Sequence, residues 1–335
     1  MSAFYSKART FRRHHQGINC LCFSKSGLLA SGGEDRLLCI WDASSGQLLY
    51  EQECQGNVTC LLWKDADTLV CGTGEGFLSI ISFDASFIEI LEVHVLCLAF
   101  YTRGDKELIC AAGRGVIIML ERDLDDGLWT FCGARAALPR ADVVTSLNFL
   151  NNGSTVVASY ATSKELPSQR LLAGLALAGA SQNEACYKDV INYAPSGSLS
   201  IASDDKLALI HNLKNGFDLI SMASGSPVRS FHTSFPPAQR QRPLPVAFGQ
   251  GETIAIAGDA DGRVLIWKAA DGLELQILEH EVNQQIFYLS TWSSALGTEH
   301  QIAVATETPE GANEIHIWCA GVRGGQKNAF FMVDC

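Results

Sequence analysis

The stretch that decides the fold is residues 14–50, which read HHQGINCLCFSKSGLLASGGEDRLLCIWDASSGQLLY. Four short apolar segments (INCLCF, LLASG, LLCIW and QLLY) are separated by turns rich in Gly, Ser and Asp. Short apolar runs bounded by such residues predict β-strands. Residues 14–50 are therefore expected to form one four-stranded antiparallel meander.

The same pattern recurs along the chain. Further units begin at Val58, Val95, Val143, Val190, Pro245 and Asn283. Apolar third strands can be anchored at Trp41, Ile81, Met119, Ile220, Trp267 and Trp318, and the anchor of the unit beginning at Val143 is not fixed. Four short strands repeating every 40–45 residues or so are typical of propeller blades. We predict an all-β fold, a seven-bladed β-propeller with four antiparallel strands per blade.

Two boundaries of this pattern need separate interpretation. The fifth unit is predicted to begin with the strand VINYAP (residues 190–195), which leaves the role of LSIAS (residues 199–203) open. The seventh unit has no fourth strand after Trp318, whereas KARTF (residues 7–11) precedes the first unit. We expect this N-terminal strand to close the last blade, so that no blade stays open. Residues 1–319 then form one propeller domain, and residues 320–335 a C-terminal tail.

The first unit resembles a WD40 repeat, because it carries the pair Trp41-Asp42 after the turn sequence Ser31-Gly32-Gly33-Glu34-Asp35. The resemblance implies a hydrogen-bonded chain of His14, Ser31, Asp35 and Trp41 that fixes the blade. A buried indole N–H needs such an acceptor. Corresponding structural positions are expected at Asp261, Trp267 and Trp318.

His14, Asp35 and Ser31 are also the residue types of a catalytic triad. Ser31 lies inside a predicted strand, however, and no nucleophile elbow surrounds it. The structural role is therefore favoured, and we expect no catalytic residues and no enzyme activity.

Metal and cofactor sites are not expected. Asp259-Ala260-Asp261-Gly262 has the start of a calcium loop, but Arg263 and Val264 follow where further oxygen ligands are needed. The histidines do not fall into metal-ligand spacing. We predict no metal, no cofactor and no small-molecule substrate.

Composition limits the compartment and the partners. The chain has 335 residues, 47% of them hydrophobic, and a formal net charge of −11, which argues against nucleic-acid binding. The twelve cysteines form no CxxC pair, which favours a reducing compartment, the cytoplasm or the nucleus. Residues 1–15 are basic without the apolar segment of a secretory signal, and the mitochondrial presequence that they also suggest would overlap the first predicted strand. Residues 171–180 are too few to span a bilayer, so no membrane contact is expected.

The resemblance also implies where a partner binds. In a WD40 propeller, the loops between blades and the turns between second and third strands share one face, which we call the top face. The predicted partner-binding residues on this face are Arg36, Arg114, Arg140, Arg240, Arg242 and Arg263. Arginine grips carboxylates and phosphates in a bidentate way, so acidic or phosphorylated peptides are the expected ligands.

We therefore predict a non-catalytic scaffold that binds peptides or partner proteins through propeller loops. An alternative is a substrate-receptor subunit of a ubiquitin ligase. That subclass often carries Arg two residues after the WD pair, where this chain has Ser44. A propeller enzyme is the third alternative, and the sequence offers no catalytic constellation for it.

Overall fold

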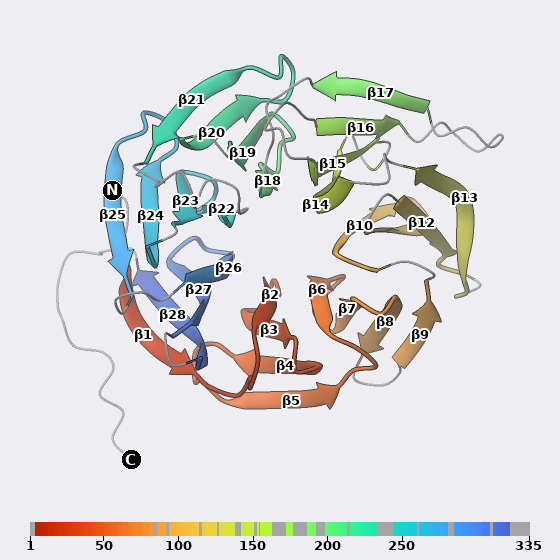
Figure 1. The fold of residues 1–335 in the computed structure, drawn as a ribbon, viewed down its shortest axis with the longest axis horizontal. Helices are drawn as coiled ribbons and strands as arrows, with labels where there is room; N and C mark the ends of the chain where they lie inside the picture. Colours follow the sequence, from red (N-terminus) through yellow and green to blue (C-terminus); the bar gives the residue numbers. More distant parts are fainter. Residues whose placement is uncertain are drawn as a thin grey trace.

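The computed structural model describes residues 4–321 except for 83–85, 92–93, 114–115, 126, 138–141, 151–152, 154, 163–171, 177–185, 192–197, 213–214, 234–243, 260, 281–284 and 309–310. Every regular element among the described residues is a β-strand, and the strands form four-stranded antiparallel sheets. Figure 1 shows the sheets arranged around a common centre, with the first strand of each sheet innermost. The all-β prediction is thereby confirmed, and the sheets are consistent with the blades of a WD40 propeller.

We number the sheets in chain order. Sheet 1 contains β2 (Ile18–Phe23), β3 (Leu28–Gly33), β4 (Leu37–Asp42) and β5 (Leu48–Glu53). Sheet 2 contains β6 (Val58–Trp63), β7 (Thr68–Thr73), β8 (Phe77–Ser82) and β9 (Ser86–Ile90). Sheet 3 contains β10 (Cys97–Arg103), β11 (Lys106–Ala112), β12 (Val116–Asp123) and β13 (Trp129–Ala137).

The remaining sheets follow the same order. Sheet 4 contains β14 (Asp142–Leu150), β15 (Thr155–Thr162), β16 (Leu172–Ala176) and β17 (Cys186–Ile191). Sheet 5 contains β18 (Leu199–Ile201), β19 (Leu207–His211), β20 (Gly216–Ser221) and β21 (Pro227–His232). Sheet 6 contains β22 (Val246–Gly249), β23 (Ile254–Gly258), β24 (Arg263–Lys268) and β25 (Glu274–Glu279). Sheet 7 contains β26 (Gln285–Ser293), β27 (Glu299–Glu307), β28 (Asn313–Gly321) and β1 (Ser6–Phe11).

The predicted start of the fifth unit is wrong. Val190 lies in β17, which pairs with β16 as the outer strand of sheet 4, and the inner strand of sheet 5 is the short β18. Both segments are short and apolar, so only their pairing partners distinguish them, and pairing is a tertiary property. At the other end of the chain, β28 continues to Gly321, beyond the predicted domain boundary at residue 319.

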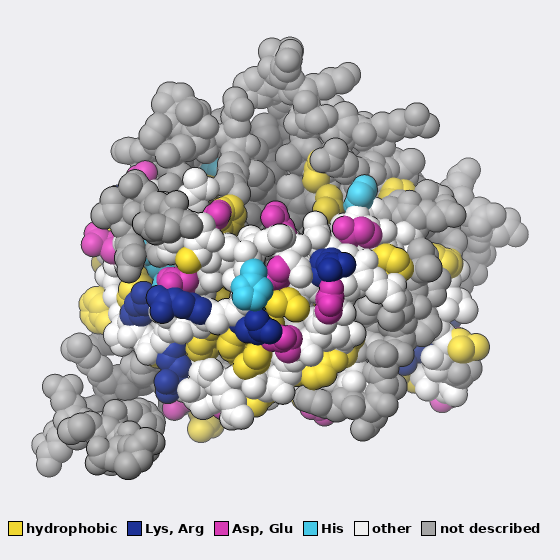
Figure 2. Space-filling view, turned by 60° about the horizontal axis from the view of Figure 1, so that its bottom comes forward, with side chains coloured by type: hydrophobic (Ala, Val, Ile, Leu, Met, Phe, Trp, Pro, Cys, Tyr) yellow, Lys and Arg dark blue, Asp and Glu magenta, His cyan; other side chains and the backbone are white. Residues whose placement is uncertain are grey.

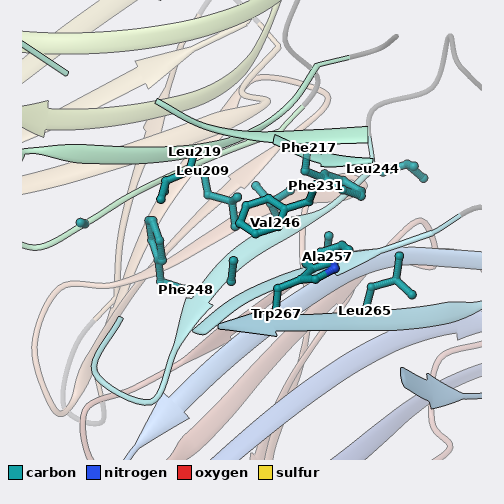
Figure 3. Packing of buried hydrophobic residues seen from close by; sticks show 12 residues of the cluster. Leu209, Phe217, Leu219, Phe231, Leu244, Val246, Phe248, Ala257, Leu265 and Trp267 are labelled. Atoms are coloured by element: carbon teal, nitrogen blue, oxygen red, sulfur yellow. The ribbon is translucent and has the colours of Figure 1, made fainter. Parts of the chain in front are cut away.

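The hydrophobic core is divided among the interfaces between sheets. Each neighbouring pair of sheets shares one cluster of buried apolar side chains, and one such cluster joins sheet 7 to sheet 1. Figure 3 shows the cluster between sheets 5 and 6, where Phe217 and Phe231 point toward Trp267. The inner strands β2 and β26 are also in contact. Each sheet is therefore covered on both faces, as a flat apolar sheet requires.

The N-terminal strand β1 belongs to sheet 7, and aromatic residues at its two ends pack against sheets 6 and 1. It pairs antiparallel with β28, from Ser6 opposite Cys319 to Phe11 opposite Ile315, with an irregularity between Lys7 and Arg9. An extra residue at a bulge moves the side chains that follow it to the opposite face of the sheet. Tyr5 accordingly packs in the cluster between sheets 6 and 7, and Phe11 packs in the cluster between sheets 7 and 1.

Candidate functional site

The four residues assigned to the blade network of the first unit meet at one place in sheet 1. Trp41 Nε1 donates to Ser31 Oγ at 3.0 Å, and Ser31 Oγ lies 2.9 Å from His14 Nε2. His14 Nδ1 lies 3.0 Å from Asp35 Oδ1. A carboxylate only accepts, so His14 donates through Nδ1 and accepts the Ser31 hydroxyl proton at Nε2. The chain of donors thus runs from tryptophan through serine and histidine to aspartate.

Asp35 is held by more than the imidazole. The backbone N–H groups of His15 and Leu37 also donate to its carboxylate, at 2.8 and 3.1 Å. Burial alone would raise the pKa of Asp35, but the hydrogen bonds from His14 and from these two amides outweigh it and lower the pKa below its ordinary value. The carboxylate therefore stays ionised and orients His14.

Solvent access separates this network from a catalytic triad. The distances between Ser31, His14 and Asp35 are those of a nucleophile, a base and an orienting acid. Ser31, however, is fully buried at 0% exposure, and its oxygen already accepts the Trp41 indole. A nucleophile has to reach a substrate, so the geometry favours a structural role.

In sheet 6 the buried turn carboxylate is Asp259, and the assignment of this position to Asp261 needs correction. Asp259 is 1% exposed and accepts hydrogen bonds from the backbone N–H of Asp261 at 2.9 Å and of Arg263 at 2.7 Å. Asp261 is half-exposed and contacts the Arg263 guanidinium at 3.1 Å. Ala257 lies ten residues before Trp267, as Ser31 lies ten residues before Trp41. Sheet 6 therefore has no serine hydroxyl at the position that links Trp41 to His14 in sheet 1.

Trp267 and Trp318, the two other tryptophans assigned to the blade network, have different neighbours from Trp41. Trp267 lies 4.9 Å from Phe231 in a stacked arrangement and 5.8 Å from Phe217, between ring centroids. Trp318 donates from Nε1 to His280 Nε2 at 3.3 Å. Sequence reasoning missed His280, because it lies in the connection between sheets 6 and 7, far from Trp318 in the sequence.

The half-buried His280 and the buried His316 lie beside Trp318, with their ring centroids 4.9 Å apart. His280 Nδ1 donates to Gly262 O at 2.9 Å, which leaves Nε2 free to accept from Trp318. His316 lies 3.0 Å from Thr306 Oγ1 and 3.1 Å from Thr10 Oγ1 of β1. Burial lowers the pKa of His280 to about 4 and that of His316 to about 3.

Two of the six predicted partner-binding arginines are described, and both bind acids of their own chain. Arg36 contacts Glu53 at 2.6 Å, and Arg263 contacts Asp259 at 2.6 Å. Arg114, Arg140, Arg240 and Arg242 lie outside the described residues. On the face seen in Figure 2, the coloured Lys and Arg side chains are interspersed with Asp and Glu. Arg36 and Arg263 are thus less available to a ligand than sequence reasoning expects.

The described part of the chain shows no group of three or more His, Cys, Asp or Glu side chains placed to hold a metal ion. In the same residues, no helix has the length and apolar character that crossing a membrane requires.

Comparison with known proteins supports the interpretation of the first sheet. Residues 5–42 match the family model of the WD domain, G-beta repeat (WD40). The match spans β1 to β4 and includes all four residues of the relay. The resemblance of the first unit to a WD40 repeat is confirmed by this match over residues 5–42.

One curated relative is the Centriole proteome protein 16 of Chlamydomonas reinhardtii. The two sequences are 37% identical over 86 residues, which make up 25% of this chain and 4% of the relative. The chain therefore spans only a small part of the length of this relative.

Proposed function

We propose that the chain is a non-catalytic interaction scaffold, built as one closed, seven-bladed WD40 propeller over residues 1–319 and followed by a tail. Its loops bind peptides or partner proteins in the cytoplasm or nucleus. The observation that carries the proposal is the chain of hydrogen bonds from Trp41 through Ser31 and His14 to Asp35. This chain supports a structural role for the three residues of the WD40 match that are of the catalytic-triad types, because Ser31 is buried and already bonded to Trp41. The contact between sheets 7 and 1 supports closure of the ring.

The scaffold function is tested by affinity purification of the full chain followed by mass spectrometry. A stoichiometric protein partner is the expected result. The printed name of the relative makes centriolar proteins one class to look for. Recovery of the chain alone, together with turnover of a metabolite, would overturn the proposal in favour of an enzyme.

Binding of acidic or phosphorylated peptides on the top face is tested by charge reversal. Arg240→Glu with Arg242→Glu should weaken capture of the partner, and the capture by the unaltered chain should decrease as salt is added. Lys268→Glu is a matched control, because Lys268 ends β24 next to a turn between third and fourth strands, where it contacts Asp271 at 2.6 Å. Equal capture by all three chains would refute the top-face assignment while leaving the scaffold function standing.

A further inference from the structure

Exposed apolar side chains gather on one hairpin of sheet 3. Among the residues that the structure describes, Leu124, Leu128 and Phe131 are 50%, 69% and 57% exposed. All three lie on the β12–β13 hairpin, at the right of Figure 1. The exposed Leu296, by contrast, lies in the turn between β26 and β27 of sheet 7. Single exposed apolar residues are ordinary on a protein surface, whereas several on one hairpin favour an interaction site.

Backbone hydrogen bonds hold Leu124 and Gly127, which are described residues of the connection between β12 and β13. Gly127 N donates to Asp123 O at 3.2 Å, with Gly127 at φ 71°. Leu124 N donates to Asp105 O at 2.9 Å, which ties the turn to the β10–β11 turn. Trp129 lies two residues before Phe131, and the Arg122 guanidinium lies over its ring, 5.2 Å from the ring centroid. We call Leu124, Leu128 and Phe131, with the acids around them, the β12–β13 surface.

The charges around this surface are mainly negative. Lys106 lies 3.6 Å from Glu121 and 3.4 Å from Asp123, so one cation faces two carboxylates. Asp105 and Asp125 are exposed, and Arg103 is the other exposed cation of the two turns. Arg122 does not contribute, because it pairs with the buried Glu107. Four carboxylates against two cations give the surface a negative potential.

We propose that the β12–β13 surface binds a basic amphipathic segment of a partner protein, whose apolar side chains cover Leu124, Leu128 and Phe131 and whose Lys or Arg side chains face the carboxylates. An apolar surface ringed by one sign of charge selects a ligand that is apolar on one side and oppositely charged at its edges. The inference rests on the proposed scaffold function and names a second binding surface, away from the top-face loops.

The probe is a fluorescein-labelled amphipathic peptide of leucine and lysine, titrated into the full chain and followed by fluorescence anisotropy. The unaltered chain should bind it, and added salt should weaken binding. Leu124→Ser with Leu128→Ser should weaken binding by about tenfold or more. Asp105→Asn with Asp125→Asn should weaken binding at low salt and flatten its salt dependence. A leucine and glutamate peptide of the same pattern should not bind.

The matched control is Leu296→Ser, which removes a leucine that is 87% exposed in the β26–β27 turn. Thermal denaturation verifies that each variant is folded. Equal binding by the unaltered chain and the Leu124/Leu128 variant, or equal loss in the Leu296 variant, would overturn the proposal. So would binding of the glutamate peptide, or self-association in sedimentation that the Leu124/Leu128 variant abolishes, which would assign the surface to a second copy. Partner capture through the top face is measured separately, so the two proposals fail independently.

Discussion

At the scale of single residues, the hydrogen-bonded chain Trp41–Ser31–His14–Asp35 in sheet 1 leaves none of its side-chain N–H and O–H groups without a partner. Ser31 accepts from Trp41 and donates to His14, so its hydroxyl is the link between two buried groups. The sequence predicts these four residues together because all lie within one unit whose spacing is intact. His280 could not be found in this way, since its partner Trp318 belongs to another repeat and only the packing of sheets 6 and 7 brings them together.

Ser31→Ala should destabilise the fold, because it leaves the Trp41 N–H and His14 Nε2 buried without their partner. Each unsatisfied buried group costs about 1–3 kcal/mol. The free energy of unfolding, measured by urea denaturation, should fall accordingly. Ser6→Ala, at an exposed position of β1, is the control and should change little. Equal stability of the Ser31 variant and the unaltered chain would mean that the relay does not fix the blade.

We expect the free energy of unfolding to fall in acid, because burial lowers the pKa of His280 and of His316. The pKa values of His280 and His316 in the fold, about 4 and about 3, lie below the ordinary 6.5. Between pH 6.5 and about 4 the unfolded chain binds protons that the folded chain does not, so the free energy of unfolding falls as pH falls. The slope approaches about 1.4 kcal/mol per pH unit for each such histidine.

Urea denaturation across this pH range tests the effect. His316→Gln, which removes one titrating group, should flatten the slope, whereas His15→Gln at an exposed position should leave it unchanged. An unaltered slope in the His316 variant would show that this side chain titrates alike in both states.

At the scale of elements, the bulge in β1 decides which hydrophobic clusters the side chains at its two ends enter. Phe11 follows Tyr5 by six positions, an even spacing that would place the two side chains on one face of a regular strand. The irregularity between Lys7 and Arg9 places them on opposite faces. Tyr5 then reaches sheet 6, where its backbone N–H and C=O bond the Gln276 side chain, and Phe11 stacks on Trp41 at 4.9 Å. The sequence predicts the strand but not the bulge, which becomes visible only in its pairing with β28.

Deleting Ala8 should remove the bulge and bring Tyr5 out of its cluster. The expected loss is similar to that of Tyr5→Ala, about 3–5 kcal/mol for a large buried aromatic side chain. The midpoint of thermal denaturation should fall in both variants, while Ala8→Ser at this exposed position should keep it. A deletion variant as stable as the unaltered chain would show that the strand re-registers without loss.

At the scale of the whole molecule, the repeat period predicts the order of the sheets among the described residues better than their boundaries. The units with intact turns are placed correctly, whereas the boundary between sheets 4 and 5 is not. There, neither a Trp nor a tight turn marks the third strand, and β17 and β18 look alike as apolar runs. The sheet to which a strand belongs depends on pairing between residues that are distant in the sequence. A local sequence pattern does not reveal this pairing.

Removal of residues 1–11 should destabilise the proposed closed propeller, because sheet 7 loses its outer strand and two clusters each lose an aromatic side chain. We expect aggregation, or a broad unfolding transition, in size-exclusion chromatography and calorimetry. Removal of residues 322–335, the proposed tail after β28, is the control and should leave a single sharp transition. A sharp, unshifted transition after the N-terminal truncation would contradict closure through β1.

The division of the described hydrophobic core into separate wedges between neighbouring sheets also bears on how such a chain diverges. A substitution in one wedge disturbs only the two sheets that bound it, so its damage stays local and its neighbours can compensate. Sheets 2, 3, 4 and 5 indeed lack the tryptophan that sheets 1, 6 and 7 carry in their third strands. Repeats in this arrangement are free to drift apart at unequal rates, and a family signature can fade from most of the chain while the architecture persists.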